Sequence, residues 1–321
     1  MIKDCPKLKQ IETKHYKEVK LKQIEIMSER EIVTIGSYEE VKVASVATSQ
    51  SEESKNEKLI LFAEKLLTKS KSLLLAALGL VIFGGLWELL SAITKDALPG
   101  PIATLTVLYE MISDPFYDYG PNDKGIGLQL FNSIKTVLLG FFLGSLVAIP
   151  LGILMGASNT CKQIFYPIVQ LLKPVSPLAW FPIGLVVFKD TGLATIFIVF
   201  ITSLWSTLIN TSFGIASLPQ DHKNVAKAFG FSKMRYLTKI LIPFSLPHII
   251  TGLRLSISVA WLVIVAGEML SGGAGIGFFV WDSWNALSLE KVISAIIIIG
   301  IVGLLFDKLF TYIENKVAYK A

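Results

Sequence analysis

Six apolar blocks of membrane-spanning length constrain this chain more than any other feature of its sequence. They cover residues 73–93, 134–156, 164–188, 193–217, 248–270 and 292–314. A helix of about 20 apolar residues crosses roughly 30 Å of hydrocarbon, and helices satisfy their own backbone there. Composition agrees, because 52% of the 321 residues are hydrophobic and 17% are charged, whereas soluble domains carry about 25% charged residues. We predict an all-α membrane protein with about six transmembrane helices.

Lysine and arginine are distributed unevenly among the segments that join these blocks. The 55–72 segment, the 218–247 insert and the C-terminal tail are basic, whereas the 94–133 loop is mostly acidic. Because lysine-rich and arginine-rich short loops remain in the cytoplasm, both termini and the insert are predicted to be cytoplasmic. The net charge of +5 could indicate nucleic acid, but its placement explains it by orientation, so we expect no nucleic-acid partner.

The first 72 residues differ from the rest of the chain. Residues 1–57 mix both charge signs without a core-forming period, which predicts a flexible cytoplasmic tail. Residues 58–72 place apolar side chains on one helical face with lysines at its flanks, which predicts an amphipathic helix on the inner membrane surface. The transmembrane domain is then expected to cover residues 73–315.

Small and polar residues repeat along two of the blocks. The second block carries a residue without a large side chain every four positions, which predicts close approach of a neighbouring backbone: Gly140, Gly144, Ala148, Gly152 and Gly156. The fourth block has a polar face, which either packs against another helix or lines a solute path: Ser203, Ser206, Thr207, Asn210, Thr211 and Gly214.

Catalytic and cofactor motifs are missing from the sequence. It lacks the G-x-x-x-x-G-K-[ST] pattern that cradles a nucleotide. SGGAGIG at 271–277 follows a membrane block rather than a strand, so we expect a flexible extracytoplasmic loop there. The three histidines are widely separated, so no metal site is expected. The chain is therefore predicted not to be an enzyme on its own and to bind no cofactor itself.

The 218–247 insert stands between two apolar blocks. It carries several lysines and an arginine on a helical pattern that Gly230 interrupts. We expect two short helices, begun after Pro219 and stopped by Pro243, with glycine at the turn. A short, partly apolar helix that projects into the cytosol suits a groove on a partner protein. A helix lying on anionic lipid explains the pattern equally well.

The insert resembles the cytoplasmic loop of permeases from binding-protein-dependent ABC importers. That loop has the pattern EAA, three residues, G, nine residues, I-x-L-P. Both spacers have the right length here, and the matching positions are Asn224, Val225 and Ala226 for EAA, Gly230 for G, and Ile240, Ile242 and Pro243 for I-x-L-P. The chain departs from the pattern by Asn224 for Glu, Val225 for Ala and Ile242 for Leu, so a family contact made by the glutamate is lost.

The resemblance covers roughly residues 73–315. LPGP (98–101) and QLLKPVSPLAWFPIG (170–184) are similar to the nitrate, sulfonate and taurine branch, and SDPFYDYGPNDKG (113–125) to nitrate permeases and their bicarbonate relatives. It implies a type I ABC importer permease fold in the bacterial cytoplasmic (inner) membrane. It also implies that the insert, with Phe229 and Met234 among its contact residues, docks on an ATPase.

The resemblance further implies import of nitrate, and of nitrite, by alternating access. Bicarbonate is the first alternative, followed by sulfonate, taurine or cyanate. The implied partners are a second permease copy, two cytoplasmic ABC ATPases that bind ATP and magnesium, and an extracytoplasmic substrate-binding protein. An ATP-independent channel or secondary transporter remains an alternative that an inverted repeat or paired half-helices would favour. A membrane sensor that works through residues 1–72 is a third.

Ionisable residues inside the blocks are candidates for the solute path, because charge within a membrane is costly. Lys173 lies near the middle of its block, and the prolines that follow it predict a broken helix that lines a cavity. Glu268 lies near an extracytoplasmic end, where it gates the path or faces water. Arg254 lies near a block end and is expected to extend towards the interface. The weaker pathway candidates are Ser176, Trp180, Ser206 and Asn210.

Overall fold

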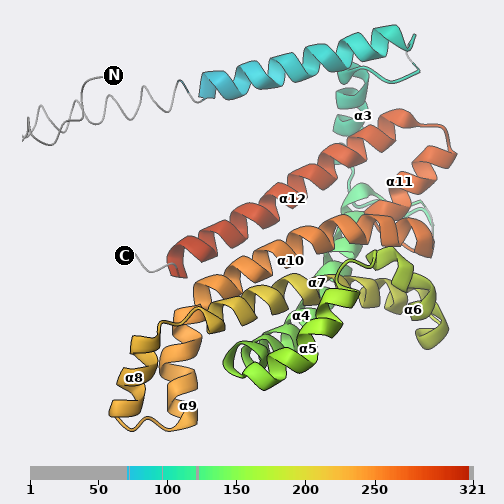
Figure 1. The fold of residues 1–321 in the computed structure, drawn as a ribbon. Coiled ribbons are helices and arrows are strands. Elements are labelled where there is room, and N and C mark those ends of the chain that lie inside the picture. Colours follow the sequence, from blue (N-terminus) through green and yellow to red (C-terminus); the bar gives the residue numbers. More distant parts are fainter. Residues whose placement is uncertain (1–70, 72, 96, 121–122, 318–321) are drawn as a thin grey trace, which may run out of the picture. The chain divides into compact units, whose positions relative to one another are not determined.

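The computed structural model describes residues 71, 73–95, 97–120 and 123–317. The predicted tail at 1–57 and the predicted interfacial helix at 58–72, apart from Lys71, lie outside this range. Within it, the β-pairing is limited to a single bridge between Asp118 and Lys124. Figure 1 shows the helices Leu73–Ile93, α3 (Pro101–Ser113), α4 (Ile126–Ala157), α5 (Asn159–Leu172), η1 (Pro177–Trp180), α6 (Phe181–Phe188), α7 (Thr191–Ala216), α8 (Gln220–Ala228), α9 (Lys233–Tyr236), η2 (Leu237–Leu241), α10 (Ile242–Ser271), α11 (Ile276–Asn285) and α12 (Leu289–Val317).

The long helices confirm the predicted number of membrane spans. Five are long and apolar enough to cross a membrane, and a sixth is obtained if α5 and the η1–α6 segment count as one broken span. The third block is thus bent by 97° between Leu172 and Pro177, as the prolines after Lys173 predicted. The predicted second block, residues 134–156, is shorter than the helix found there, because α4 already begins at Ile126.

The chain divides into two units, residues 1–82 and 83–321. In the first unit, the described residues belong to the start of the Leu73–Ile93 helix, whose leucines are exposed. In the second unit, α4 packs on α7, α7 on α10, and α12 on α10, α11 and α3. Helix α3 lies inside the segment expected to be a loop. Its start is explained by Gly100 followed by Pro101, which has the φ angle of a first helical residue.

The glycine stripe of α4 lies directly against the backbone of α7. A Cβ atom on Gly144 would stand 2.8 Å from the carbonyl oxygen of Phe200, and one on Gly152 would stand 2.8 Å from that of Leu208. Ala148, which has the one methyl group in this register, is fully buried. The predicted backbone approach is therefore confirmed from Gly140 to Gly156, in the second half of α4.

Hydrogen bonds between side chains and backbone join α7 to α10. The Ser256 hydroxyl of α10 donates to the carbonyl oxygen of Ser203 at 2.7 Å and lies 2.7 Å from the Thr207 hydroxyl. All three residues are buried. In the absence of water such bonds hold apolar helices together. For Ser203 and Thr207, the structure therefore supports interhelical packing rather than the lining of a solute path.

Gly144→Ala tests the α4–α7 contact. Overpacking a closely packed site costs about 1–3 kcal/mol, and the added methyl group would meet the backbone of α7, which cannot rotate away. We expect a lower Tm for the variant in detergent. Gly300→Ala on α12 is the matched control, because nothing lies within 4 Å of its Cβ position. Equal Tm values for the two variants would contradict the close approach.

Candidate functional site

The 218–247 insert forms two helices joined by a tight turn (Figure 1). Helix α8 begins after Pro219, as predicted, and carries Asp221 in its first turn and Lys227 in its last. Both charges are favourable at those ends of the helix dipole. Helix α9 begins at Lys233 after the Ser232 hydroxyl, which accepts a hydrogen bond from the Arg235 N–H. Serine is among the preferred residues at this capping position.

Gly230 makes the turn between α8 and α9 possible. It has a φ angle of +62°, in the left-handed region that side chains strongly disfavour. The Phe231 N–H donates to the carbonyl oxygen of Ala226, and the Gly230 N–H donates to that of Lys227, each at 3.0 Å. These two bonds form the Schellman motif that ends many helices at a glycine. The predicted helix–glycine–helix shape is confirmed, with Gly230 in its expected role.

Pro243 does not stop the second helix, so this prediction is wrong. α9, η2 and α10 form one helix, Lys233–Ser271. Leu237–Leu241, just before Ile242 and Pro243, adopts a π turn, in which the Ile242 N–H donates to the carbonyl oxygen of Leu237. A π turn widens the helix, which is a known way to accommodate a proline in a continuing helix. The second half of the insert is therefore continuous with a membrane-length helix.

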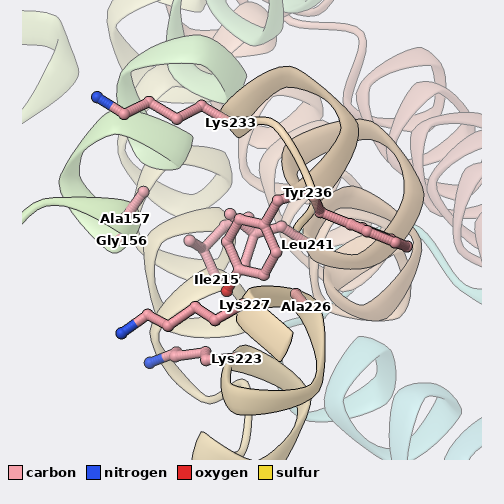
Figure 2. Close-up of a pocket in the computed structure, with 10 residues that line it drawn as sticks. Gly156, Ala157, Ile215, Lys223, Ala226, Lys227, Lys233, Tyr236 and Leu241 are labelled. Carbon is pink, nitrogen blue, oxygen red and sulfur yellow. The ribbon is translucent and has the colours of Figure 1, made fainter. Parts of the chain in front are cut away.

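The residues that match the family pattern separate into two groups. Ala226 is buried between the two helices, near Leu241 and Tyr236 (Figure 2). Ile240 and Ile242 are half-buried. The second group is exposed and mostly apolar. Val225, Phe229 and Met234 are 52%, 76% and 69% exposed, and the polar Asn224 is also exposed. The two helices of the insert thus pack against each other through Ala226, while large apolar side chains of the insert remain exposed.

Lys173 lies at the end of α5, where the third block breaks. Its N–H donates to the carbonyl oxygen of Val169 at 2.9 Å as the last bond of that helix. Its side chain and that of Ser176 are exposed, and among the described residues neither side chain has a hydrogen bond or ion pair. The two candidates therefore lie together at the break, and Lys173 has no ion-pair partner among the described residues.

The other pathway candidates lie on different elements. Trp180 belongs to η1, which contacts both α7 and α10, and it packs against the buried cluster of Phe181, Ala194 and Ile198. Ser206 and Asn210 lie one turn apart on α7, half-buried, with the Asn210 amide donating to the Ser206 carbonyl oxygen at 2.8 Å. The structure gives no contact that joins these three to Lys173, so the common site remains a prediction.

Glu268 does not face water, which corrects one of the two expectations for it. Only 4% of the residue is exposed. One carboxylate oxygen accepts hydrogen bonds from the Ser133 hydroxyl at 2.7 Å and from the Gly277 N–H at 2.9 Å. The N–H groups of Gly275 and Ile276 donate to Gln129 and Ser133 at 2.6 and 2.8 Å.

These bonds also correct the expectation of a flexible loop at 271–277. The first N–H groups of a helix have no partner inside it, and here side chains of α4 and α10 supply partners for three at the start of α11. Glycine is required at Gly275 because a Cβ atom there would overlap the Glu268 carboxylate. The segment is anchored, and no short motif in the sequence shows that its partners come from α4 and α10.

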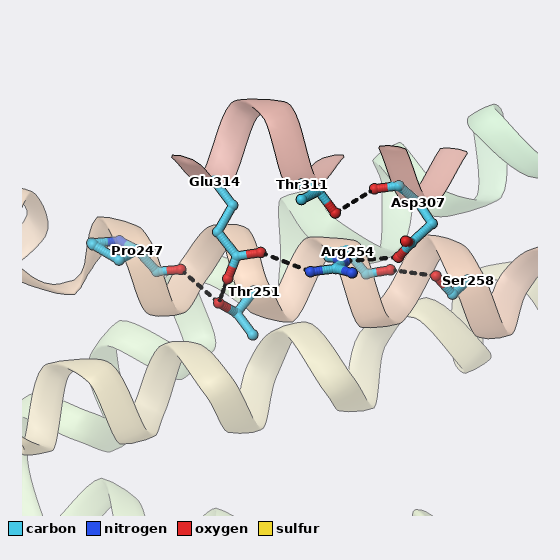
Figure 3. Close-up of polar contacts among 7 residues, drawn as sticks. All are labelled: Pro247, Thr251, Arg254, Ser258, Asp307, Thr311 and Glu314. Carbon is cyan, nitrogen blue, oxygen red and sulfur yellow. Dashed lines mark hydrogen bonds and ion pairs between the residues drawn. The ribbon is translucent and has the colours of Figure 1, made fainter. Parts of the chain in front are cut away.

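Arg254 is paired rather than extended towards an interface (Figure 3). Its guanidinium donates to Asp307 at 2.8 Å and to Glu314 at 3.1 Å, both on α12. Thr251 donates to the second oxygen of Glu314 at 2.6 Å. Charges within membrane-length helices usually find such partners. The two acidic residues, seven positions apart in the last apolar block, were the sequence signal that could have predicted this cluster.

The loop before α4, which carries SDPFYDYGPNDKG, is folded in its described part. Asp118 and Lys124 form an ion pair at 3.1 Å, and the Gly125 N–H donates to the Tyr117 carbonyl oxygen at 2.7 Å. Tyr117 and Tyr119 stack with ring centroids 5.1 Å apart. Burial, and then the nearby Asp123 carboxylate, raise the pKa of Tyr117 above its ordinary value. A half-buried Tyr117 and an exposed Tyr119 therefore form a neutral aromatic pair just before α4.

Solved structures of transporters share this helix arrangement. A chain of the methionine ABC transporter MetNI, solved in inward-facing conformations, superposes with a TM-score of 0.54 over 59% of this chain and 94% of that one, at 13% identity. A chain of an amino acid ABC transporter gives a TM-score of 0.51 over 67% and 96%, at 18% identity. The fold is that of type I ABC importer permeases, as predicted.

Two other permeases have higher sequence identity to this chain than the solved structures have. The nitrate import permease protein NrtB of Synechocystis sp. is 42% identical over 241 residues, which is 75% of this chain and 88% of the relative. The bicarbonate transport system permease protein CmpB of Synechococcus elongatus is 39% identical over 250 residues, 77% and 90% of the two chains. The family described as binding-protein-dependent transport system inner membrane component matches residues 148–319. The chain is an ABC transporter permease of this family and a multi-pass inner-membrane protein.

Proposed function

We propose that this chain is the permease subunit of an ATP-driven importer that carries nitrate, and nitrite, into the cytoplasm. Coupling to an ATPase is supported by the insert. Its two helices, joined by a turn at Gly230, expose Val225, Phe229 and Met234. An exposed apolar helix face at a rigid helix end is suited to a groove on another protein. The choice of nitrate as substrate is supported by the similarity to the NrtB nitrate import permease proteins.

The proposed assembly contains two copies of this chain, two cytoplasmic ABC ATPases and an extracytoplasmic substrate-binding protein. ATP and magnesium bind to the ATPases. The insert and both termini lie in the cytoplasm, in agreement with the basic segments of the sequence. Closure of the ATPases draws the two inserts together, and the helices that continue from them change access to the central path from inward to outward. This is a two-state, rigid-body transition.

Bicarbonate is the second candidate substrate. CmpB of Synechocystis sp. is 42% identical to this chain over 243 residues, as similar as NrtB from the same organism. Nitrate and bicarbonate are both planar monovalent oxyanions, so one cationic contact such as that of Lys173 suits either. Overall identity therefore does not separate the two substrates, and a transport measurement is needed.

Gly230→Val tests the coupling site. The left-handed conformation costs a residue with a side chain roughly 1–2 kcal/mol, and a β-branched residue more, so the turn between α8 and α9 should open. We expect the variant to retain about tenfold less ATPase in co-purification while it still inserts in the membrane.

The control for this variant is Gly272→Val. Gly272 ends α10 with a φ angle of +69° and, like Gly230, has nothing within 4 Å of its Cβ position. The backbone strain is therefore the same, but it lies outside the insert. ATPase retention should fall for Gly230→Val and not for Gly272→Val. An equal effect of both, or of neither, would count against docking through the insert.

Uptake into proteoliposomes tests the substrate. The chain is reconstituted with its ATPases and binding protein, and labelled nitrate is compared with labelled bicarbonate and taurine. We expect nitrate uptake that requires ATP. Bicarbonate uptake alone would keep the importer and exclude nitrate. Uptake that ignores ATP would exclude the importer and favour a channel or secondary transporter.

Lys173→Ala tests the cationic contact in the same vesicles. If the exposed, unpaired ammonium at the helix break meets the anion, its loss removes a charge-assisted hydrogen bond worth about 1.5–3 kcal/mol. The rate of nitrate uptake should fall about tenfold or more, with ATPase retention unchanged. Lys162→Ala, at the exposed start of α5, should transport normally. Normal uptake by Lys173→Ala would exclude this residue from the path.

A further inference from the structure

A cavity lies on the inner side of the insert, where α8 and α9 meet the ends of α4 and α7. Its volume is about 320 Å³, and three lysines line it: Lys223, Lys227 and Lys233. Figure 2 shows the ammonium groups of Lys223 and Lys227 at one edge of the cavity and that of Lys233 at the opposite edge, with Gly156 and Ala157 of α4 between the two edges. Tyr236 and the apolar side chains of Ile215 and Leu241 lie deeper.

The three charges have no partner within the described part of the chain. The ion pairs found there join other residues. The one acidic residue of α8, Asp221, is exposed and does not line the cavity. Lys223 is half-buried, and Lys227 and Lys233 are exposed, so an anion that enters from the surrounding water can reach their ammonium groups.

The cavity is separate from the face that the coupling proposal uses. Val225, Phe229 and Met234 are exposed and do not line it, whereas Ala226, on the same helix, does. Helix α8 therefore turns its lysines and Ala226 towards the membrane domain and its large apolar side chains away from it. Occupation of one face leaves the other accessible.

The lining indicates what kind of anion fits. Three ammonium groups exceed what a single carboxylate neutralises, whereas a phosphate group offers several oxygens to point charges of this kind. The volume is at the lower end of that of small-molecule sites, about 300–1,000 Å³, and exceeds the size of a bare oxyanion. The apolar floor is suited to an organic group attached to the phosphate.

We propose that this cavity binds a phosphate-bearing group and that the bound group holds α8 and α9 against the ends of α4 and α7. The headgroup of an inner-leaflet anionic phospholipid and a soluble phosphate share this chemistry. Binding does not depend on the proposed function. Its consequence does, because an insert clamped to the membrane domain transmits movement from an attached ATPase more directly.

The test measures binding to the full-length chain without ATPases. In one arm, nanodiscs of phosphatidylcholine with phosphatidylglycerol report retained phosphatidylglycerol by native mass spectrometry. In the other arm, nanodiscs of phosphatidylcholine alone report radiolabelled inorganic phosphate by equilibrium dialysis. We expect saturable binding in at least one arm, and the arm that binds identifies the source of the phosphate.

Matched variants assign the binding to the cavity. Replacing Lys223, Lys227 and Lys233 together by Gln should weaken it at least about tenfold, since charge-assisted bonds are lost. The triple replacement by Arg should retain it, which shows that the chain still folds. Lys239→Gln removes a charge from the same insert outside the cavity and should leave binding unchanged.

Four results would overturn the proposal. The first is no binding of either probe. The second is binding that survives in the triple Gln variant, and the third is an equal loss of binding in Lys239→Gln. The fourth, when neither probe binds, is protection of the three lysines from chemical modification by added ATPases. The last would assign the charges to an acidic surface of that partner. Because transport is not measured, failure here leaves the importer proposal standing, and failure of uptake leaves this one standing.

Discussion

Contact between the backbones of α4 and α7 is the constraint on which the rest of the fold depends. Lipid is as apolar as leucine, so helices in a membrane gain little from burying leucine and associate through close packing and hydrogen bonds. The glycines of α4 supply the packing, and a neighbouring face of α7 supplies the hydrogen bonds to α10 through Ser256, with Ser203 taking part in both contacts. Helix α7 is thus fixed on two sides, and the insert that follows it starts from a fixed point.

The insert is stabilised by local rules more than by long-range contacts. A proline before α8, a Schellman turn at Gly230 and a serine cap before α9 each act within a few residues. Such signals are readable in a sequence, which is why the helix–glycine–helix shape was predictable. The end of the second helix was not. Proline normally ends a helix, and no sequence pattern indicates the π turn at Leu237–Leu241, whose last residue is buried with Ile215 and Leu218.

The same division explains the other corrections. The number of spans and the glycine stripe follow from patterns along the chain, so they could be predicted. Glu268 could not be placed, because its partner Ser133 is 135 residues away and no motif links the two. The partner of Arg254, Asp307, is 53 residues away, and the only signal for this pair was the two acidic residues of the last apolar block. A buried polar group is satisfied by whatever the fold brings to it. The pathway candidates share this limit, since Lys173, Ser206 and Asn210 lie on elements whose alignment no sequence pattern sets.

The continuity of the helix through Pro243 changes what the insert can do. Lys233–Ser271 has 39 residues, which corresponds to roughly 58 Å at 1.5 Å per residue. One end carries Met234 on the exposed face of the insert, and the other carries Glu268, which holds the start of α11. A hinge at Pro243 would dissipate a displacement of the insert within the cytoplasmic loop. No break separates the insert from α10, so the helix that carries Met234 at one end also contacts α11 through Glu268 and α12 through Arg254. Under the proposed coupling, a displacement of the insert acts directly on the helix that makes these two contacts.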